Sequence, residues 1–181
     1  MNDKKHFCLA KTILTEKEIQ RRVSDLALSL TAEYKDSKRL ILIGVLKGSF
    51  IFLSDLIRAI PLSIEIDFIQ ANSYGFGTVS SRSISILKDI TLNITEADVI
   101  LVEDIIDSGN TIQKIIDLLS SRKPKSLKLC TLLDKPARRE THVTMDWVGF
   151  CIPDVFVVGY GLDAAEQFRN LPYLAEAKEM I

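Results

Sequence analysis

The segment 99–111, "VILVEDIIDSGNT", concentrates groups that could do chemistry. Four apolar residues lead into two adjacent carboxylates, Glu103 and Asp104, whose negative charges repel each other. A third carboxylate, Asp107, lies three residues further on and is followed by a Ser-Gly-Asn-Thr run at 108–111. Because a bound cation or sugar hydroxyls would relieve that repulsion, the pattern indicates a ligand site at the end of a buried strand.

The Ser-Gly-Asn-Thr run stands where a helix over 110–121 is predicted from isoleucine and leucine residues at helical spacing. The first turn of a helix has unpaired N–H groups and a partial positive charge. Hydroxyls, these N–H groups and a glycine that permits close backbone approach together favour a phosphate cradle. The predicted phosphate-binding residues are Ser108, Gly109, Asn110 and Thr111.

Different functions are predicted for the three carboxylates. Glu103 and Asp104 could accept hydrogen bonds from a sugar diol or hold Mg²⁺ through hard oxygen ligands. Asp107 lies between them and the cradle, where a base could act on the group that attacks the sugar. The alternative is structural: Asp107 and Ser108 could simply cap the helix, with the acidic pair exposed at a strand end.

Strand and helix patterns alternate along the chain, which predicts an α/β fold with a mostly parallel twisted sheet flanked by helices. Expected strands cover 39–46, 63–70, 84–90, 98–104, 126–133 and 155–161, and expected helices cover 15–34, 49–60 and 110–121. Ligands bind beyond the carboxyl ends of strands in such sheets. That rule selects four strand ends, at 46–48, 103–104, 134–135 and 159–161.

Composition limits the class of protein. The 181 residues suit one domain over 1–181, and a net charge of −1 gives no support for a broad nucleic-acid-binding face. No apolar run reaches the ~18 residues of a membrane span. Three well-separated cysteines and two histidines make no zinc or disulfide pattern, which favours reduced thiols and a cytoplasmic location.

The 99–111 segment resembles the phosphoribosyl-diphosphate (PRPP) binding motif of the type I phosphoribosyltransferases: two acidic residues, two apolar, Asp, Ser/Thr, Gly, any residue, Thr. The resemblance implies PRPP as substrate, pyrophosphate as product and Mg²⁺ as cofactor at Glu103 and Asp104. It also implies a mobile lid over about 71–83, beginning at Ser73 and Tyr74, and a small hood from about 1–15 and 134–181.

Further segments extend the resemblance over about 10–175 and narrow it to the hypoxanthine-guanine members. "GVLKGSF" is similar to their pyrophosphate loop, so Lys47 and Gly48 would contact pyrophosphate, with the Leu46–Lys47 peptide able to be cis. "LLDKPARR" resembles the segment whose lysine, here Lys135, recognises the 6-oxo group of the purine. A side chain that only donates hydrogen bonds favours a carbonyl oxygen over the amino group of adenine.

The C-terminal segment "DWVGFCIPDVFVVGYGLDAAEQFRNLP" resembles the signature of the same members. By that resemblance Phe156 would stack on the purine and Val157 would bind it through its backbone. Asp163, also at the purine site, would hold a second Mg²⁺, and Arg169 would approach pyrophosphate. No role is assigned to Arg138 or Arg139.

The sequence therefore predicts a purine-salvage enzyme that joins PRPP to N9 of hypoxanthine, and of guanine, giving IMP or GMP. The resemblance implies a homodimer or homotetramer, with no nucleic-acid or membrane partner. Two alternatives stay open: another PRPP-dependent transferase, such as a xanthine-preferring one, and a nucleotide-sensing RNA-binding regulator with a PRPP motif. The net charge of −1 and the set Lys47, Lys135, Asp163 and Arg169 favour the enzyme.

Overall fold

The computed structural model describes residues 6–73 and 84–180. Its elements, in chain order, are β1 (Phe7–Leu14), α1 (Glu16–Tyr34), β2 (Leu40–Leu46), α2 (Phe50–Ala59), β3 (Ile64–Ser73), β4 (Ile84–Lys88), β5 (Asp98–Ile106), α3 (Asn110–Ser120), β6 (Ser126–Asp134), the short 3-10 helix η1 (Pro136–Arg138), β7 (Trp147–Cys151), β8 (Val157–Val158) and β9 (Leu174–Glu179). The helices predicted over 15–34, 49–60 and 110–121 are confirmed as α1, α2 and α3.

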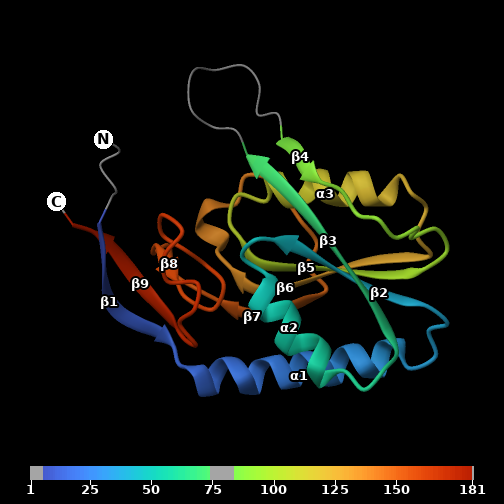
Figure 1. Cartoon of the computed structure of the whole chain (residues 1–181), viewed down its shortest axis with the longest axis horizontal. Helices are drawn as coiled ribbons and strands as arrows, with labels where there is room; N and C mark the ends of the chain where they lie inside the picture. The colour runs from blue at the N-terminus through green and yellow to red at the C-terminus, as the bar shows by residue number, and fades with distance from the viewer. Residues whose placement is uncertain (1–5, 74–83, 181) are drawn as a thin grey trace.

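The large sheet has the strand order β4-β3-β2-β5-β6-β7 (Figure 1). Only the pair β3–β4 is antiparallel, so the predicted mostly parallel α/β sheet is confirmed. β5 lies between β2 and β6, with Gly44 opposite Val102 and Glu103 opposite Thr131. The carboxyl ends of β2, β5 and β6 therefore meet at one edge of the sheet.

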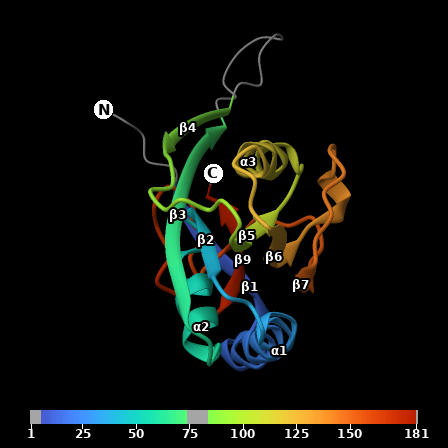
Figure 2. The same cartoon turned by 90° about the vertical axis from the view of Figure 1, so that its right-hand side faces the viewer.

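Helices cover both faces of this sheet, α1 and α2 on one side and α3 on the other (Figure 2). Alternate side chains of β2 point to opposite faces of the sheet. Leu40 and Leu42 pack in the core with α1 and α2, while Ile41 and Ile43 pack in the core with α3. Because both faces are buried, β2 and β5 have near-continuous apolar sequences.

The start of α1 shows how sequence sets a local boundary. Thr15 is the N-cap, and its Oγ1 accepts a hydrogen bond from the backbone N–H of Glu18 at 3.3 Å. The carboxylate of Glu18 accepts in return from the backbone N–H of Thr15 at 2.8 Å. This reciprocal capping box satisfies N–H groups that the first helical turn would leave unpaired.

A small antiparallel sheet of order β1-β9-β8 joins segments from the two ends of the described chain (Figure 1). The strand predicted over 155–161 is shorter than expected: only Val157–Val158 is a strand, and it pairs with β9. Positive φ angles at Gly159, Tyr160 and Gly161, of 100°, 48° and 102°, turn the chain away and end it.

Strands β1, β7 and β9 were not predicted from the sequence. β1 is mostly exposed and β7 is half-buried, and each is defined as a strand by its pairing, β1 with β9 and β7 with β6. β7 falls within 134–181, the range expected for the hood, yet it pairs with β6 in the large sheet. The small sheet alone lies outside the large one.

The structure also bears on the predicted lid, the cysteines and the search for a membrane span. Ser73 is the last residue of β3, whereas Tyr74 and the rest of the predicted lid, up to 83, lie outside the described residues. The cysteines Cys8, Cys130 and Cys151 are free thiols. Within 6–73 and 84–180, no helix combines the length and apolar character needed to cross a membrane.

Candidate active site

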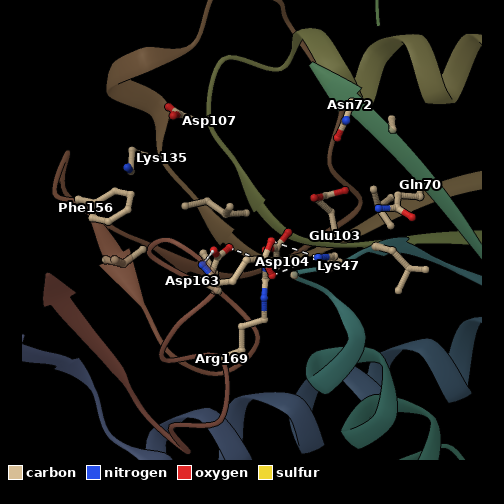
Figure 3. Close-up of a pocket in the computed structure, with 18 of the residues that line it drawn as sticks. Lys47, Gln70, Asn72, Glu103, Asp104, Asp107, Lys135, Phe156, Asp163 and Arg169 are labelled. Carbon is tan, nitrogen blue, oxygen red and sulfur yellow. Dashed lines mark hydrogen bonds and ion pairs between the residues drawn. The ribbon is translucent and has the colours of Figure 1, made fainter. Parts of the chain in front are cut away.

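A cavity of about 720 Å³ opens at the carboxyl edge of the large sheet (Figure 3). Its lining includes residues from three of the four strand ends that the sequence selected, at 46–48, 103–104 and 134–135, and residues that flank the fourth, Val157 and Leu162. The predicted site residues on its wall are Lys47, Gly48, Glu103, Asp104, Asp107, Lys135, Phe156, Val157, Asp163 and Arg169. Segments far apart in the sequence thus contribute to one ligand-sized space.

A smaller cavity of about 210 Å³ adjoins it and is lined by Ser108, Gly109 and Thr111 of the predicted phosphate cradle. Glu103 and Asp107 line both cavities, so the two spaces share one wall. Glu103 and Asp107 therefore lie between the cradle residues and the larger cavity.

The cradle is fixed by a neighbouring segment at 140–141. Gly109 is the N-cap of α3 with a φ of 86°, and a Cβ atom there would lie 2.5 Å from the carbonyl oxygen of Thr141. Asn110 donates from its side chain to Glu140 at 2.7 Å and accepts from Thr141 Oγ1 at 2.5 Å. The Asn110 side chain is therefore engaged in holding the loop, and its backbone N–H donates to Ser108 Oγ at 3.3 Å.

Glu103 and Asp104 are consecutive residues of β5, and their carboxyl groups lie close enough for each to shift the pKa of the other. Burial raises the pKa of Glu103 well above its usual range, and the charge of Asp104 raises it further. Burial also raises the pKa of Asp104. The pocket without ligand therefore disfavours two negative charges here, and a cation or donor hydroxyls would favour them.

Asp107 and Lys135 are linked by a chain of ion pairs through two residues that the sequence analysis did not assign. Arg138 Nη1 lies 3.9 Å from Asp107 Oδ2, and Arg138 Nε lies 2.7 Å from Asp154 Oδ1. The same Asp154 oxygen is 3.8 Å from the Nζ atom of Lys135, whose side chain is only 6% exposed. The buried ammonium group therefore has a carboxylate partner at the cavity wall.

The other carboxylate oxygen of Asp107, Oδ1, is buried and accepts no hydrogen bond from the described residues. It is an unsatisfied acceptor that could accept a hydrogen bond from a bound ligand.

Arg139 has a different role from Arg138. Its guanidinium donates to the carbonyl oxygens of Asp107 and Ile106, at 2.9 and 3.2 Å, and pairs with Asp134. Arg139 therefore braces the end of β5 against the end of β6.

Phe156 presents a half-exposed ring to the cavity. The ring of Phe7 in β1 lies 5.7 Å from it, centroid to centroid, at an interplanar angle of 33°. An exposed aromatic ring held from behind is suited to stack on a flat heterocycle. The small sheet supplies that support, because β1 carries Phe7 and β8 begins directly after Phe156.

Lys47 follows a cis Leu46–Lys47 peptide, the geometry that the resemblance allowed. The Arg169 guanidinium lies 2.6 Å from Asp163 and donates to the carbonyl oxygen of Gly161 at 2.8 Å. Gly161 in turn lies against the backbone of the 46–48 loop, since a Cβ atom on it would be 2.0 Å from the carbonyl oxygen of Gly48. The C-terminal loop and the 46–48 loop therefore form one wall.

The sequence analysis missed several residues of the cavity wall, notably Gln70, Asn72, Arg138 and Glu166. Gln70 and Asn72 are two positions apart in β3, so they share a face of the strand. Extending the alternation past the predicted strand end at 70 could have found Asn72. No local signal identifies Arg138 or Glu166, because their contacts come from other segments.

Comparisons with known proteins agree with this architecture. The family model described as a phosphoribosyl transferase domain matches residues 10–165. The fold and the site therefore define a phosphoribosyltransferase.

Individual relatives narrow the class. Over 167 residues the chain is 50% identical to a hypoxanthine phosphoribosyltransferase of Escherichia coli, covering 92% of this chain and 94% of that protein. A crystal structure of a hypoxanthine-guanine phosphoribosyltransferase from Bacillus anthracis matches with a TM-score of 0.88 at 46% identity, over 96% of this chain and 100% of that one. A hypoxanthine phosphoribosyltransferase structure from Staphylococcus aureus matches with a TM-score of 0.89 at 45% identity, over 94% and 92% of the two chains. The chain belongs to the hypoxanthine phosphoribosyltransferase family, which confirms the resemblance drawn from its motifs.

Proposed function

We propose that this chain transfers the 5-phosphoribosyl group of PRPP to N9 of hypoxanthine, and of guanine, producing IMP or GMP and pyrophosphate. Besides membership of the hypoxanthine phosphoribosyltransferase family, one structural observation supports the proposal. Two adjoining cavities that share a wall bring together the predicted cradle, an acidic pair, a buried lysine and an exposed aromatic ring, from segments far apart in the sequence. This is a purine-salvage reaction catalysed by a pentosyltransferase.

The ribose 5-phosphate of PRPP binds the cradle at 108–111, where backbone N–H groups and hydroxyls surround the small cavity. Glu103 and Asp104 accept the ribose diol hydroxyls. Their raised pKa values support this assignment, because donor hydroxyls would stabilise charged carboxylates that the empty pocket disfavours.

The purine binds between Phe156 and the lysine of the "LLDKPARR" segment. Lys135 donates to the 6-oxo oxygen, and the backbone of Val157 supplies a further hydrogen bond. Adenine would bring an amino group against the Lys135 ammonium and leave two donors unpaired, so it is a poor substrate.

In the reaction, the purine N9 lone pair forms a bond to the ribose C1 carbon as the bond from C1 to the pyrophosphate oxygen breaks. The electron pair of the broken bond leaves with pyrophosphate, and the proton at N7 passes to Asp107. The free Oδ1 atom of Asp107 supports its role as acceptor. Lys47, Gly48 and Arg169 bind the departing anion, and the positive ribose centre of the transition state favours catalysis by positioning and electrostatics.

Magnesium fits the donor set of this pocket. Glu103, Asp104 and Asp163 are hard oxygen ligands on its wall, and Mg²⁺ usually combines one or two carboxylates with substrate phosphates. Within the described part of the chain, no three His, Cys, Asp or Glu side chains converge on a metal site. Mg²⁺ held jointly by these carboxylates and PRPP would neutralise the diphosphate.

The remaining expectations extend this proposal. The chain acts as a homodimer or homotetramer in the cytoplasm, and a lid that begins at Ser73 and Tyr74 excludes water from the reacting ribose. A nucleotide-sensing RNA-binding regulator is not favoured, because the relatives found by sequence and structure are named as transferases. A xanthine preference gains no support from those names either.

Steady-state assays with PRPP and Mg²⁺ test the proposal by presenting hypoxanthine, guanine, xanthine and adenine in turn. We expect nucleotide formation with hypoxanthine and guanine, and at least about 10²-fold lower kcat/KM with adenine. Pyrophosphate release measured alongside nucleotide formation gives a one-to-one ratio if the reaction is group transfer. Absence of pyrophosphate release with every base would contradict the proposal and return attention to the regulator.

A further inference from the structure

Four charged side chains form a chain of ion pairs on the pyrophosphate side of the cavity, and Figure 3 labels three of them, Lys47, Asp163 and Arg169. Lys47 Nζ donates to both carboxylate oxygens of Glu166 at 3.1 Å. Arg169 Nη2 lies 2.6 Å from Asp163 and 3.3 Å from Glu166. Two cations that the proposed reaction needs for pyrophosphate are therefore already paired with two carboxylates.

The two carboxylates differ in how firmly they are held. Asp163 and Arg169 are 27% and 19% exposed, and Arg169 is further fixed to the carbonyl oxygen of Gly161. Glu166 and Lys47 are 65% and 53% exposed. Ion pairs between exposed side chains contribute little and are screened by water and salt. A multiply charged ligand can therefore displace Glu166 more easily than Asp163.

The loop backbone points Glu166 toward these cations. Ala165, Glu166 and Phe168 have positive φ angles of 50°, 64° and 75°, a region that side chains with a Cβ atom rarely adopt. The N–H of Glu166 donates to the carboxylate of Asp163 at 2.7 Å, which fixes the turn. Hydrogen bonds from Lys47 and the ion pair with Arg169 hold the Glu166 carboxylate against both cations.

We propose that Glu166 is an internal competitor of pyrophosphate: its carboxylate occupies Lys47 and Arg169 when the site is empty, yields them to the diphosphate of PRPP, and reclaims them as pyrophosphate leaves. This inference rests on the proposed function. Competition by a tethered anion weakens binding of the free product and so promotes its release. Glu166 is thus a residue that tunes pyrophosphate affinity and touches no reacting atom.

The substitution Glu166→Gln tests the role, because it keeps the shape of the side chain and removes its charge. Titration of the full chain with inorganic pyrophosphate and Mg²⁺ by calorimetry measures the affinity without any base present. We expect Kd for pyrophosphate to fall by about 5-fold in the variant, the scale of one exposed ion pair, and product inhibition to strengthen equally.

Two controls sharpen the result. Glu33→Gln removes an ion pair of the same kind, to Lys128, away from the cavity, and leaves Kd unchanged. In a Lys47→Met background the effect of Glu166→Gln shrinks, because the competitor has lost one of its two cations. A structural role for Glu166 predicts the opposite sign, since a disordered loop would bind pyrophosphate more weakly.

An unchanged or higher Kd in Glu166→Gln overturns the inference, whatever the outcome of the base assays. Equal Tm values for the variant and wild type, measured beforehand, show that the comparison is between folded proteins. If hypoxanthine is not a substrate while Kd still falls, the competitor role stands and only the proposed reaction is lost. If hypoxanthine is a substrate and Kd does not fall, only this inference is lost.

Discussion

Gly48 lies directly against the carboxylate of Asp104: a Cβ atom added to Gly48 would come within 1.6 Å of Asp104 Oδ2. Asp104 is buried in β5, and Gly48 belongs to the loop that follows β2. The loop with the predicted pyrophosphate contacts and the strand with the acidic pair are therefore packed as one unit.

Substitution of Gly48 by alanine should disrupt this unit. Either the loop or the carboxylate must shift, and a displacement of about 1 Å in a catalytic site can cost on the order of 10²-fold in rate. We expect Gly48→Ala to lower kcat/KM for PRPP by about that factor, measured in steady-state assays with hypoxanthine. The same overlap should lower the Tm of Gly48→Ala. The double variant Gly48→Ala, Asp104→Ala removes the overlap, so we expect its Tm to return toward the wild-type value while its activity stays low. Wild-type kcat/KM in the single variant would show that the contact is not needed.

The raised pKa of Glu103 predicts a pH-dependent stability. Below about pH 4.3, the usual pKa of Glu, both folded and unfolded chains carry the proton. As pH rises further, the unfolded chain loses the proton first, so the free energy of unfolding falls until the raised folded pKa is passed. Glu103→Gln does not titrate, and we expect its Tm at neutral pH to exceed that of wild type by on the order of 3 °C, the shift from about 1 kcal/mol.

The gain in Tm should vanish when both proteins are measured near pH 4 by scanning calorimetry. Glu33→Gln is the matched control, since it removes an exposed glutamate that pairs with Lys128 and should leave Tm nearly unchanged. Equal Tm values for Glu103→Gln and wild type across the whole pH range would mean that the burial of Glu103 carries no cost.

Asp107→Asn tests the predicted base. The amide keeps the size of the side chain but cannot accept the N7 proton, so we expect kcat to fall 10²- to 10⁴-fold, the range typical for loss of general acid–base catalysis. KM for PRPP should change little, because the cradle and the acidic pair remain. An unaltered kcat would assign Asp107 to capping of α3 instead.

Asp154→Asn tests the ion-pair chain behind Lys135. The buried ammonium would lose the carboxylate 3.8 Å away, and an unpaired buried charge is costly, so Lys135 should be held less firmly at the cavity wall. We expect KM for hypoxanthine to rise by about 10-fold, while KM for PRPP stays constant. A rise in both KM values would point to general disruption of the cavity rather than to Lys135.

Local chemistry in the sequence determined much of this protein. The 99–111 segment predicted a strand, a cradle and three carboxylates from neighbouring residues alone, and Thr15 with Glu18 marked the start of α1. These features could be predicted because their contacts join residues a few positions apart, where spacing fixes geometry. The short β8 and the unpredicted β7 were harder, since their form depends on a positive-φ turn and on pairing with β6.

Only the tertiary structure decided which side chains oppose each other across the cavity. The contact of Gly48 with Asp104, the chain from Lys135 through Asp154 to Arg138, and the pairing of Lys47 with Glu166 join different elements. Strand order, register and the path of the C-terminal loop set these distances, and no local spacing encodes them. The sequence by itself thus predicted which groups bind and react, because their types and local spacing are written in it, while packing across the fold determined which opposite charges balance them.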